Sequence, residues 1–392
     1  MLSETKELEA VPLPENKIYY PALDGLRGLA ALAVFSFHYL GLPKQLNWGW
    51  AGVDIFFVLS GFLITGILYD SRARADRFRI FYIRRSLRIF PLYYLVLLIP
   101  VLLYPLVHWH FYRGLWVWPA YLGNYANFLF ASDYAANASP FAGLITTVHG
   151  YAFGYGLDHL WSLSVEEQFY LVWPLLVYVI GRRITLRNLC VAVAVAIPFL
   201  RLACLHFLSP RWIELGAIYF PTPLRADSLL LGGAAALALR GPEASQLQRF
   251  AKPLLLLSGL AFAAIEMLNL VQTHQLIDAS LIRNNNAFIF SLFAVLGVAM
   301  ILLMIQSGSF LFRLGMLPAL RALGQRSYGF YVYHLIFYSQ FHTIALLLML
   351  GHKKYLPQGT AVVAFVGTLV LSWLSFHYFE APILRLKSRL AP

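Results

Sequence analysis

Residues 51–69 read AGVDIFFVLSGFLITGILY and contain one charged side chain, Asp54. A run of about 20 apolar residues is long enough to cross the hydrocarbon core of a bilayer as an α-helix. Nine other stretches of the chain have a similar character. The ten expected helices lie at about 22–40, 51–69, 89–107, 160–180, 189–207, 224–240, 253–271, 286–306, 328–349 and 359–379. The sequence therefore predicts an all-α, polytopic transmembrane helical bundle of about ten spans.

The composition supports this class. The 392 residues are 60% hydrophobic and 12% charged, whereas charged residues make up about a quarter of a soluble domain. A net charge of +12 is typical of nucleic-acid binding in a soluble protein, but in a membrane protein it indicates basic cytoplasmic loops. The two cysteines, Cys190 and Cys204, lie in one apolar stretch, and we expect neither a disulfide framework nor a metal site from them.

The distribution of basic residues predicts the orientation. If the N-terminus is cytoplasmic, the inner segments contain 22 of the 30 lysines and arginines, as the positive-inside rule requires. An even number of spans then also places the C-terminus in the cytoplasm. We therefore expect a cytoplasmic tail at 1–21, a membrane domain at 22–381 and a second cytoplasmic tail at 382–392. The first 20 residues are mostly polar and do not resemble a cleavable signal peptide.

The longest outer segment, about 108–158, contains Trp109, Trp116 and Trp118. It is too polar for another pair of spans. Tryptophan is common at the depth of the lipid headgroups. We expect an interfacial or re-entrant piece here.

The first predicted span contains three ionisable residues on one helical face. In LDGLRGLAALAVFSFHY (23–39), eleven positions of 100° separate Arg27 from His38, so the two point in nearly the same direction. They lie about 16 Å apart along the helix axis. Charged groups in a span are costly without a partner and often mark function. Asp24, Arg27 and His38 are either functional, or Asp24 and Arg27 form a simple ion pair and His38 lies at the far interface.

A second group of charges precedes the third span. Arg84, Arg85 and Arg88 occur on adjacent turns in FYIRRSLRIFPLYY (81–94), where we expect the helix to begin. Arginine binds phosphate in a bidentate manner, and a helix N-terminus also favours anions. These residues suit the phosphates of coenzyme A, and anionic lipid headgroups suit them nearly as well.

The fourth span opens with HLWSLSVEEQFY (159–170). His159, Glu166 and Glu167 can form a proton relay or an acceptor site, or they can be a solvated outer helix end. Asp54, Ser60, Asp227, His334 and Glu380 are further polar residues in spans or at their ends. Each of them alone is more typical of helix–helix contacts or of an anchor at a helix end than of a catalytic residue. The chain contains no P-loop, GxSxG, HExxH or paired CxxC motif, which argues against ATP-driven transport, serine hydrolase chemistry and zinc chemistry.

With these segments in view, the chain resembles the acyltransferase-3 family of membrane O-acyltransferases. Seven blocks match in family order over nearly the whole chain. They are YPALDGLRGLAALAVFSFHY (20–39), WAGVDIFFVLSGFLI (50–64), FYIRRSLRIFPLYY (81–94), HLWSLSVEEQFYLVWP (159–174), LRADSLLLGG (224–233), LGQRSYGFYVYH (323–334) and SWLSFHYFEAPIL (372–384).

The resemblance implies roles for individual residues. The family's essential histidine corresponds to His38 and its partner arginine to Arg27. The Arg-x-x-Arg element that holds the acyl donor corresponds to Arg85 and Arg88, and the acidic residue of the WSLxxE block corresponds to Glu166.

The family also implies a reaction. Its members transfer an acyl group, often acetyl from acetyl-CoA, to a hydroxyl of a carbohydrate or glycoside such as a cell-surface polysaccharide, in the cytoplasmic membrane of bacteria. Many carry a C-terminal SGNH-type domain. This sequence ends at Pro392, just past the last expected span, which favours a stand-alone member.

We therefore expect His38 to act as a general base or to accept the acyl group itself, because an imidazole titrates near neutral pH. Asp24, Arg27 and Glu166 would orient groups or balance charge. Arg84, Arg85 and Arg88 would bind acyl-CoA, and no metal is expected. Asp54, His159, Glu167 and His334 are the residues expected to contact the acceptor. The other hypotheses are a transporter or flippase of glycans or lipid-linked precursors, and a silent membrane scaffold.

Overall fold

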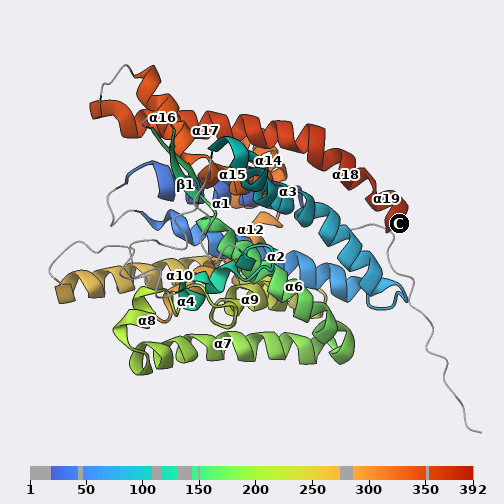
Figure 1. Ribbon diagram of the computed structural model, residues 1–392. Coiled ribbons are helices and arrows are strands. Elements are labelled where there is room, and N and C mark those ends of the chain that lie inside the picture. The colour runs from blue at the N-terminus through green and yellow to red at the C-terminus, as the bar shows by residue number, and fades with distance from the viewer. Residues whose placement is uncertain are drawn as a thin grey trace, which may run out of the picture.

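The computed structural model describes residues 19–42, 47–107, 116–130, 144–148, 151–273, 286–349 and 353–391. They form a bundle of roughly parallel and antiparallel helices (Figure 1). Within the described residues, six helices are long and apolar enough to cross a membrane. They are Trp48–Asp70, Arg77–Pro105, Asp158–Ile180, Arg183–Phe207, Ala244–Leu268 and Leu356–Leu390. The prediction of a polytopic helical membrane protein is confirmed.

Each of the ten predicted segments contains at least one helix, and most boundaries agree within a few residues. These helices are α1 (Pro21–Tyr39), α2 (Gly52–Asp70), α3 (Arg77–Val107), α6 (Trp161–Ile180), α7 (Arg183–Phe207), α9 (Ala226–Ala238), α10 (Ala244–Thr273), α12 (Ile289–Met304), α15 (Ser327–Ile336) with α16 (Tyr338–Leu348), and α17 (Leu356–Ser375).

Shorter elements connect and extend these helices. They are η1 (Trp48–Ala51), η3 (Gly123–Tyr125), α4 (Ala126–Leu129), η4 (Asp158–Leu160), α8 (Pro210–Glu214), η5 (Thr222–Leu224), α13 (Phe310–Gly315), α14 (Pro318–Gln325), η6 (Lys353–Tyr355), the π-helical turn η7 (Phe376–Glu380), α18 (Ala381–Arg385) and α19 (Lys387–Leu390).

Several predicted helix limits are wrong. Helix α7 begins at Arg183 rather than near residue 189, and α10 begins at Ala244 rather than near residue 253. Helix α3 begins at Arg77 rather than near residue 89, because its basic first half packs within the bundle as a regular helix and is not a loop. The segment 328–349 is not one helix but two, since the backbone of Phe337 leaves the helical conformation between α15 and α16. The carbonyl of Ile336 accepts a hydrogen bond from the Gly156 amide there (3.2 Å), which replaces a bond within a continuous helix.

The described part of the outer segment contains an element that the sequence did not predict. This element is an antiparallel hairpin of β1 (Leu144–Val148) and β2 (Tyr151–Tyr155), whose β-branched and aromatic residues favour strands. Apart from this hairpin, the described regular elements are helical, as predicted. Trp118 is fully buried and so does not lie at an interface with lipid, while Trp116 is exposed and Trp109 lies outside the described residues.

Helix α2 is the centre of the bundle. Most of its apolar stretch (78%) is buried inside the protein. The helix packs against α1, α6, α9 and α12. Its contact with α9 is backbone to backbone, because a Cβ at Gly61 would lie 1.8 Å from the Leu229 carbonyl oxygen. Small residues allow such close approach of helices in membranes. In contrast, α7 and α10 bury only 28% and 11% of their apolar windows, as expected of helices that face lipid.

Four charged residues lie wholly within this bundle. Arg225, at the start of α9, binds Asp54 of α2 at 2.8 Å, and Arg201 of α7 binds Asp227 of α9. None of the four side chains exposes any surface. The guanidinium of Arg225 is also covered by aromatic rings, with its central carbon 4.1 Å from the centre of the Phe290 ring. These ion pairs join α2, α7 and α9, and the pocket described next lies on the other side of α2.

Candidate active site

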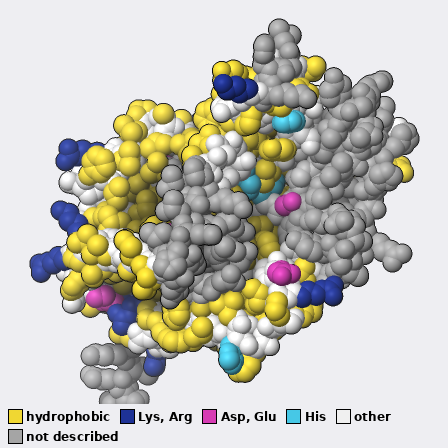
Figure 2. Space-filling model, turned by 90° about the vertical axis from the view of Figure 1, so that its left-hand side faces the viewer, with side chains coloured by type: hydrophobic (Ala, Val, Ile, Leu, Met, Phe, Trp, Pro, Cys, Tyr) yellow, Lys and Arg dark blue, Asp and Glu magenta, His cyan; other side chains and the backbone are white. Residues whose placement is uncertain are grey.

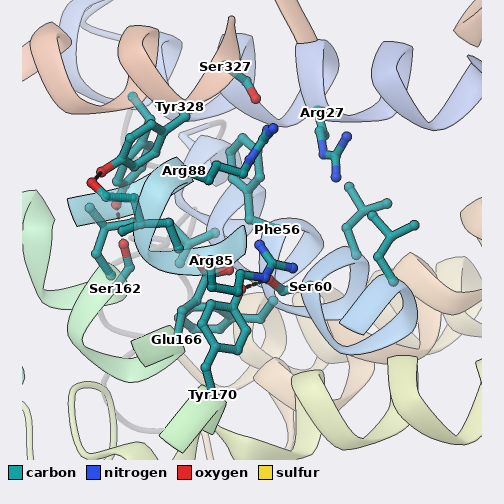
Figure 3. A pocket seen from close by; sticks show the side chains of 17 residues that line it. Arg27, Phe56, Ser60, Arg85, Arg88, Ser162, Glu166, Tyr170, Ser327 and Tyr328 are labelled. Carbon is teal, nitrogen blue, oxygen red and sulfur yellow. Dashed lines mark hydrogen bonds between the residues drawn. The ribbon is translucent and has the colours of Figure 1, made fainter. Parts of the chain in front are cut away.

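A pocket opens between α1, α2, α3, α6 and α15 (Figure 3). It contains about 780 Å³ of space not filled by protein atoms, part of it open to solvent. Its lining combines apolar and aromatic side chains with hydroxyls, three arginines and one glutamate. The lining residues are Arg27, Val53, Phe56, Phe57, Leu59, Ser60, Leu63, Arg85, Arg88, Ile89, Ser162, Leu163, Glu166, Tyr170, Ser327, Tyr328 and Tyr331.

The three arginines come from two helices. Arg85 and Arg88 lie one turn apart on α3, and Arg27 reaches the same space from α1 (Figure 3). The guanidinium carbon of Arg85 lies 4.8 Å from the centre of the Tyr170 ring. Because α3 begins at Arg77, the prediction that Arg85 and Arg88 lie at a helix N-terminus is wrong. The helix dipole acts only within the first turn and so does not strengthen anion binding by these arginines.

Arg84 points elsewhere. Its guanidinium donates two hydrogen bonds, of 3.0 and 2.7 Å, to the carbonyl of Ala391 near the C-terminus. It does not line the pocket. Neighbouring residues on a helix point in different directions. Arg85 therefore lines the pocket, while Arg84 binds the C-terminal segment.

Glu166 is the carboxylate of the pocket. Its charge interacts with the guanidinium groups of Arg85, Arg27 and Arg88 and with the Ser60 hydroxyl. The Ser60 hydroxyl also bonds the Tyr170 hydroxyl. Glu167 is outside the pocket lining, and its buried Oε1 has no hydrogen-bond partner among the described residues. The two adjacent carboxylates therefore have different surroundings.

Asp24 holds Arg27 from within the same helix. Its carboxylate accepts a hydrogen bond from the Arg27 guanidinium at 3.0 Å and another from the Tyr19 hydroxyl. The Asp24 side chain is almost buried, and Arg27 keeps about a quarter of its side chain exposed. The pair thus orients one pocket arginine, while a second guanidinium edge can still meet an anion.

Three histidines from different parts of the chain meet beyond the pocket. The ring of His334 on α15 lies 5.1 Å from that of His38 on α1 and 4.8 Å from that of His159 on η4, measured between centroids. His159 and His334 are buried, and His38 is partly exposed. Figure 2 looks onto the end of the molecule opposite the C-terminus and shows histidine side chains in the middle of that face, beside an acidic one.

Tyr331 connects the pocket to this histidine cluster. It lines the pocket, and its ring centroid lies 5.4 Å from that of His334 and 5.5 Å from that of His159. Its hydroxyl donates to the His159 carbonyl (2.8 Å), and lies 2.6 Å from the Ser162 hydroxyl. One aromatic residue therefore separates an arginine-rich pocket from a cluster of imidazoles.

The structure brings most of the predicted site residues into these two neighbouring groups. Arg27, Arg85, Arg88 and Glu166 line the pocket, and His38, His159 and His334 form the cluster. Asp54 instead lies in the buried ion pair with Arg225 and does not line the pocket.

Sequence reasoning missed the hydroxyl residues that complete the pocket, above all Tyr328 and Tyr331. Both lie in SYGFYVYH (327–334), three positions apart and thus on one helical face. A search for charged residues in spans does not find these two tyrosines. The run of aromatic residues with hydroxyl groups could have indicated a polar lining on this helix. Within the described part of the chain, no group of three or more His, Cys, Asp or Glu residues is arranged to hold a metal ion.

The chain is similar to known proteins over nearly its whole length. The family described as an acyltransferase domain matches residues 20–377. The peptidoglycan O-acetyltransferase OatA of Listeria monocytogenes is 29% identical over 379 residues, which cover 94% of this chain and 56% of that protein. The O-acetyltransferase OatA of Staphylococcus aureus is 27% identical over 394 residues, which cover 97% of this chain and 60% of that protein.

The chain thus spans less than two thirds of the length of these curated relatives. No solved structure matches it significantly. The family match nevertheless covers nearly the whole chain and includes all the helices that line the pocket. The chain belongs to the acyltransferase-3 family of membrane proteins.

Proposed function

We propose that this protein is a membrane O-acetyltransferase that transfers an acetyl group from acetyl-CoA to a hydroxyl of a cell-envelope carbohydrate. The observation that carries the proposal is the arrangement of the pocket. Three arginines line it, and Tyr331 in its wall contacts His334, which in turn contacts His38. Transfer of acetyl from CoA needs a site that binds the phosphates of the donor and a base that takes the proton of the acceptor hydroxyl.

The arginines suit the phosphates of the donor. Guanidinium groups bind phosphate oxygens through paired hydrogen bonds, and Arg85 and Arg88 come from one helix face while Arg27 comes from α1. Arg27 and His38 are about 16 Å apart along α1. A long, thin donor such as acetyl-CoA can therefore keep its phosphates on the arginines while its thioester approaches the histidine cluster past Phe56 and Tyr331.

The chemistry follows from this placement. His38 takes the proton of the acceptor hydroxyl, and the oxygen attacks the thioester carbonyl carbon. The carbon–sulfur bond then breaks, and the CoA thiolate receives the proton from His38 as it leaves. Alternatively, His38 attacks the thioester first and passes the acetyl group on from its own nitrogen. Glu166 balances the charge of the arginines in either case.

The acceptor is proposed from the relatives. The Listeria relative is a peptidoglycan O-acetyltransferase, and the histidine cluster gathers at the C-terminal end of α1, whereas Asp24 and Arg27 lie near its start. A cell-wall or surface polysaccharide with free hydroxyls is therefore the acceptor class that we propose for this chain.

The proposed topology has ten spans with both termini in the cytoplasm of a bacterium. Hydrogen bonds between predicted inner segments support it. Asp70 at the end of α2 binds Arg240 after α9 (2.6 Å), and Arg84 binds the carbonyl of Ala391. The helices α9 and α12 are shorter than a usual span of about 20 residues, but they are largely buried and need not match the thickness of the lipid.

The full chain, purified and reconstituted in vesicles, should release CoA from acetyl-CoA in the presence of a thiol reagent, and should transfer labelled acetyl to soluble peptidoglycan fragments. His38→Ala should abolish both reactions, and His377→Gln, which changes an exposed histidine on η7, should not. Transport of a glycan across the vesicle membrane without acetyl-CoA turnover would overturn the proposal in favour of a transporter.

A further inference from the structure

The hydrogen atoms on two rings of the histidine cluster can be assigned from their partners. Nδ1 of His38 lies 2.9 Å from the carbonyl oxygen of Val34, and Nδ1 of His334 lies 2.6 Å from that of Tyr331. A carbonyl oxygen only accepts hydrogen bonds. Each of these nitrogens must therefore carry a hydrogen, which places the basic lone pair of each neutral ring on Nε2.

This assignment gives the contact between the two rings a direction. Nε2 of His334 lies 3.4 Å from Nδ1 of His38. Since Nδ1 of His38 carries the hydrogen and Nε2 of His334 carries the lone pair, His38 donates and His334 accepts. The hydrogen on His38 is thus shared between the Val34 carbonyl and the His334 ring, as in other three-centre hydrogen bonds.

Several contacts fix His334 in this position. The Tyr39 hydroxyl, next to His38 in the chain, donates to the backbone carbonyl of His334, so α1 and α15 are joined at neighbouring residues. His159 packs its ring against His334 and donates from Nε2 to the carbonyl of Val332 at 2.8 Å. His334 is buried, and burial of an imidazole is unfavourable unless its nitrogens are hydrogen-bonded, as both are here.

We propose that His334 is a positioning residue for His38, which accepts the hydrogen bond from Nδ1 and so presents Nε2 of His38 as the base. The inference rests on the proposed function, in which His38 takes the hydroxyl proton on Nε2. The positive charge that then forms on His38 is shared through the Nδ1 hydrogen bond to His334. When the proton passes from Nε2 to the leaving CoA sulfur, both rings return to their neutral forms.

The arrangement follows the logic of nucleophile, base and orienting group in hydrolases, with a neutral imidazole as the third member. The two ring nitrogens of His334 have separate tasks, since Nδ1 binds the Tyr331 carbonyl and Nε2 binds His38. Asparagine can replace the first contact but is too short for the second. The amide oxygen of glutamine lies near the position of Nε2 and can accept the hydrogen from His38.

The test therefore compares His334→Asn with His334→Gln in the full reconstituted chain. We expect Asn to lower kcat about 10²-fold, at the lower end of what a general base contributes, with an unchanged KM for acetyl-CoA. Gln should retain most of kcat. Equal losses with both variants, or a raised KM for acetyl-CoA, would mean that His334 only supports packing and would overturn the inference.

The matched controls are His377→Asn and His377→Gln. Nδ1 of His377 binds the carbonyl of Trp373 four residues earlier (3.0 Å), as Nδ1 of His38 binds that of Val34. His377 is exposed, however, and among the described residues its ring contacts Trp373 and Phe376 rather than the cluster. Neither control should change kcat.

A second measurement does not depend on activity. In wild-type protein labelled with ¹⁵N-histidine, His38 and His334 should both be protonated on Nδ1 and not on Nε2, with the signals assigned by their loss in single variants. Protonation of neutral His334 on Nε2 would overturn the inference even in an active enzyme. If the protein instead shows no acetyl-CoA turnover but these tautomers are found, the proposed function fails and the hydrogen-bond assignment stands.

Discussion

Asp54 and Arg225 lie 171 positions apart in the chain and form an ion pair of 2.8 Å from which solvent is excluded on both sides. The Asp54 carboxylate also accepts a hydrogen bond from Ser228 at 3.0 Å. Arg225 reaches the pocket lining through Phe57, with its guanidinium carbon 5.6 Å from the centre of that ring. The pair therefore supports the wall of the pocket from behind.

Removal of one member of this pair should destabilise the protein. Asp54→Asn leaves the Arg225 charge buried without its partner, and we expect a loss of about 3–5 kcal/mol in unfolding free energy, measured by unfolding in mixed micelles. Asp76→Asn is the control, because its pair with Arg74 is exposed and an exposed ion pair contributes little to stability. A stable Asp54→Asn protein with a raised KM for the acceptor would instead support Asp54 as a substrate-binding residue.

The contact between α2 and α9 gives a second prediction. Gly61→Ala places a methyl group 1.8 Å from the Leu229 carbonyl oxygen, so the helices must separate and the yield of folded protein should fall strongly. Gly259→Ala in α10 is the control, since no atom lies within 4 Å of its new Cβ and alanine favours a helix by about 1 kcal/mol. Equal behaviour of the two variants in size-exclusion chromatography would contradict the close packing.

The donor site gives a third prediction. The double variant Arg85→Ala/Arg88→Ala should weaken CoA binding at least about tenfold, because two of the three pocket guanidinium groups are lost. Lysines at both positions should restore only part of the affinity, since an ammonium group cannot form paired hydrogen bonds. Arg84→Ala, which removes a neighbouring arginine that binds Ala391, should bind CoA normally. Isothermal titration with CoA would measure all of these, and full rescue by lysine would indicate a site that needs only charge.

The fourth prediction concerns the base. His38→Ala should lower the rate of transfer by about 10²–10⁴ if His38 is a general base, without a change in CoA affinity. His38→Gln should be no better, because an amide cannot accept a proton at neutral pH. A larger loss, together with an acetylated wild-type enzyme trapped by rapid quenching, would indicate that His38 carries the acetyl group. If His38→Gln retains most of the activity, Glu166 becomes the next candidate for the base.

The proposed topology gives the fifth prediction. In a chain with Cys190→Ala and Cys204→Ala, Ala73→Cys should react with an impermeant thiol reagent only after the cells are opened. Ser209→Cys, in the exposed connection between α7 and α8, should react in intact cells. Labelling of Ala73→Cys from outside would exclude the proposed orientation.

The positions of the main helices could be predicted because long apolar runs have few alternatives in a bilayer. The boundaries that failed depend on contacts that are distant in sequence. The break at Phe337 involves the amide of Gly156, and the first half of α3 places Arg85 and Arg88 in a pocket that distant helices complete. Hydropathy does not detect either of these.

For the site, charge within a span singled out Arg27 and Glu166, and the cluster of arginines before the third span singled out Arg85. The sequence did not predict that these residues are neighbours, and the structure places all three around one pocket. The same signal singled out Asp54, which pairs with Arg225, 171 positions later in the chain, and does not line the pocket. Arg201 is a charge in the middle of a predicted span that was overlooked, and it proved to be the partner of Asp227. An isolated charge in a span predicts a partner, but only the structure shows whether that partner is protein or ligand.

The buried ion pairs also constrain how the protein is made. Asp54 enters the membrane with α2, whereas Arg225 is synthesised 171 residues later, and a lone carboxylate in lipid is unfavourable by about 2.5–3.5 kcal/mol. The early helices must therefore remain beside the insertion machinery, or in contact with water, until α9 arrives. Nascent chains truncated before Arg225 should be targets for membrane proteases, and chains that extend beyond Asp227 should escape them.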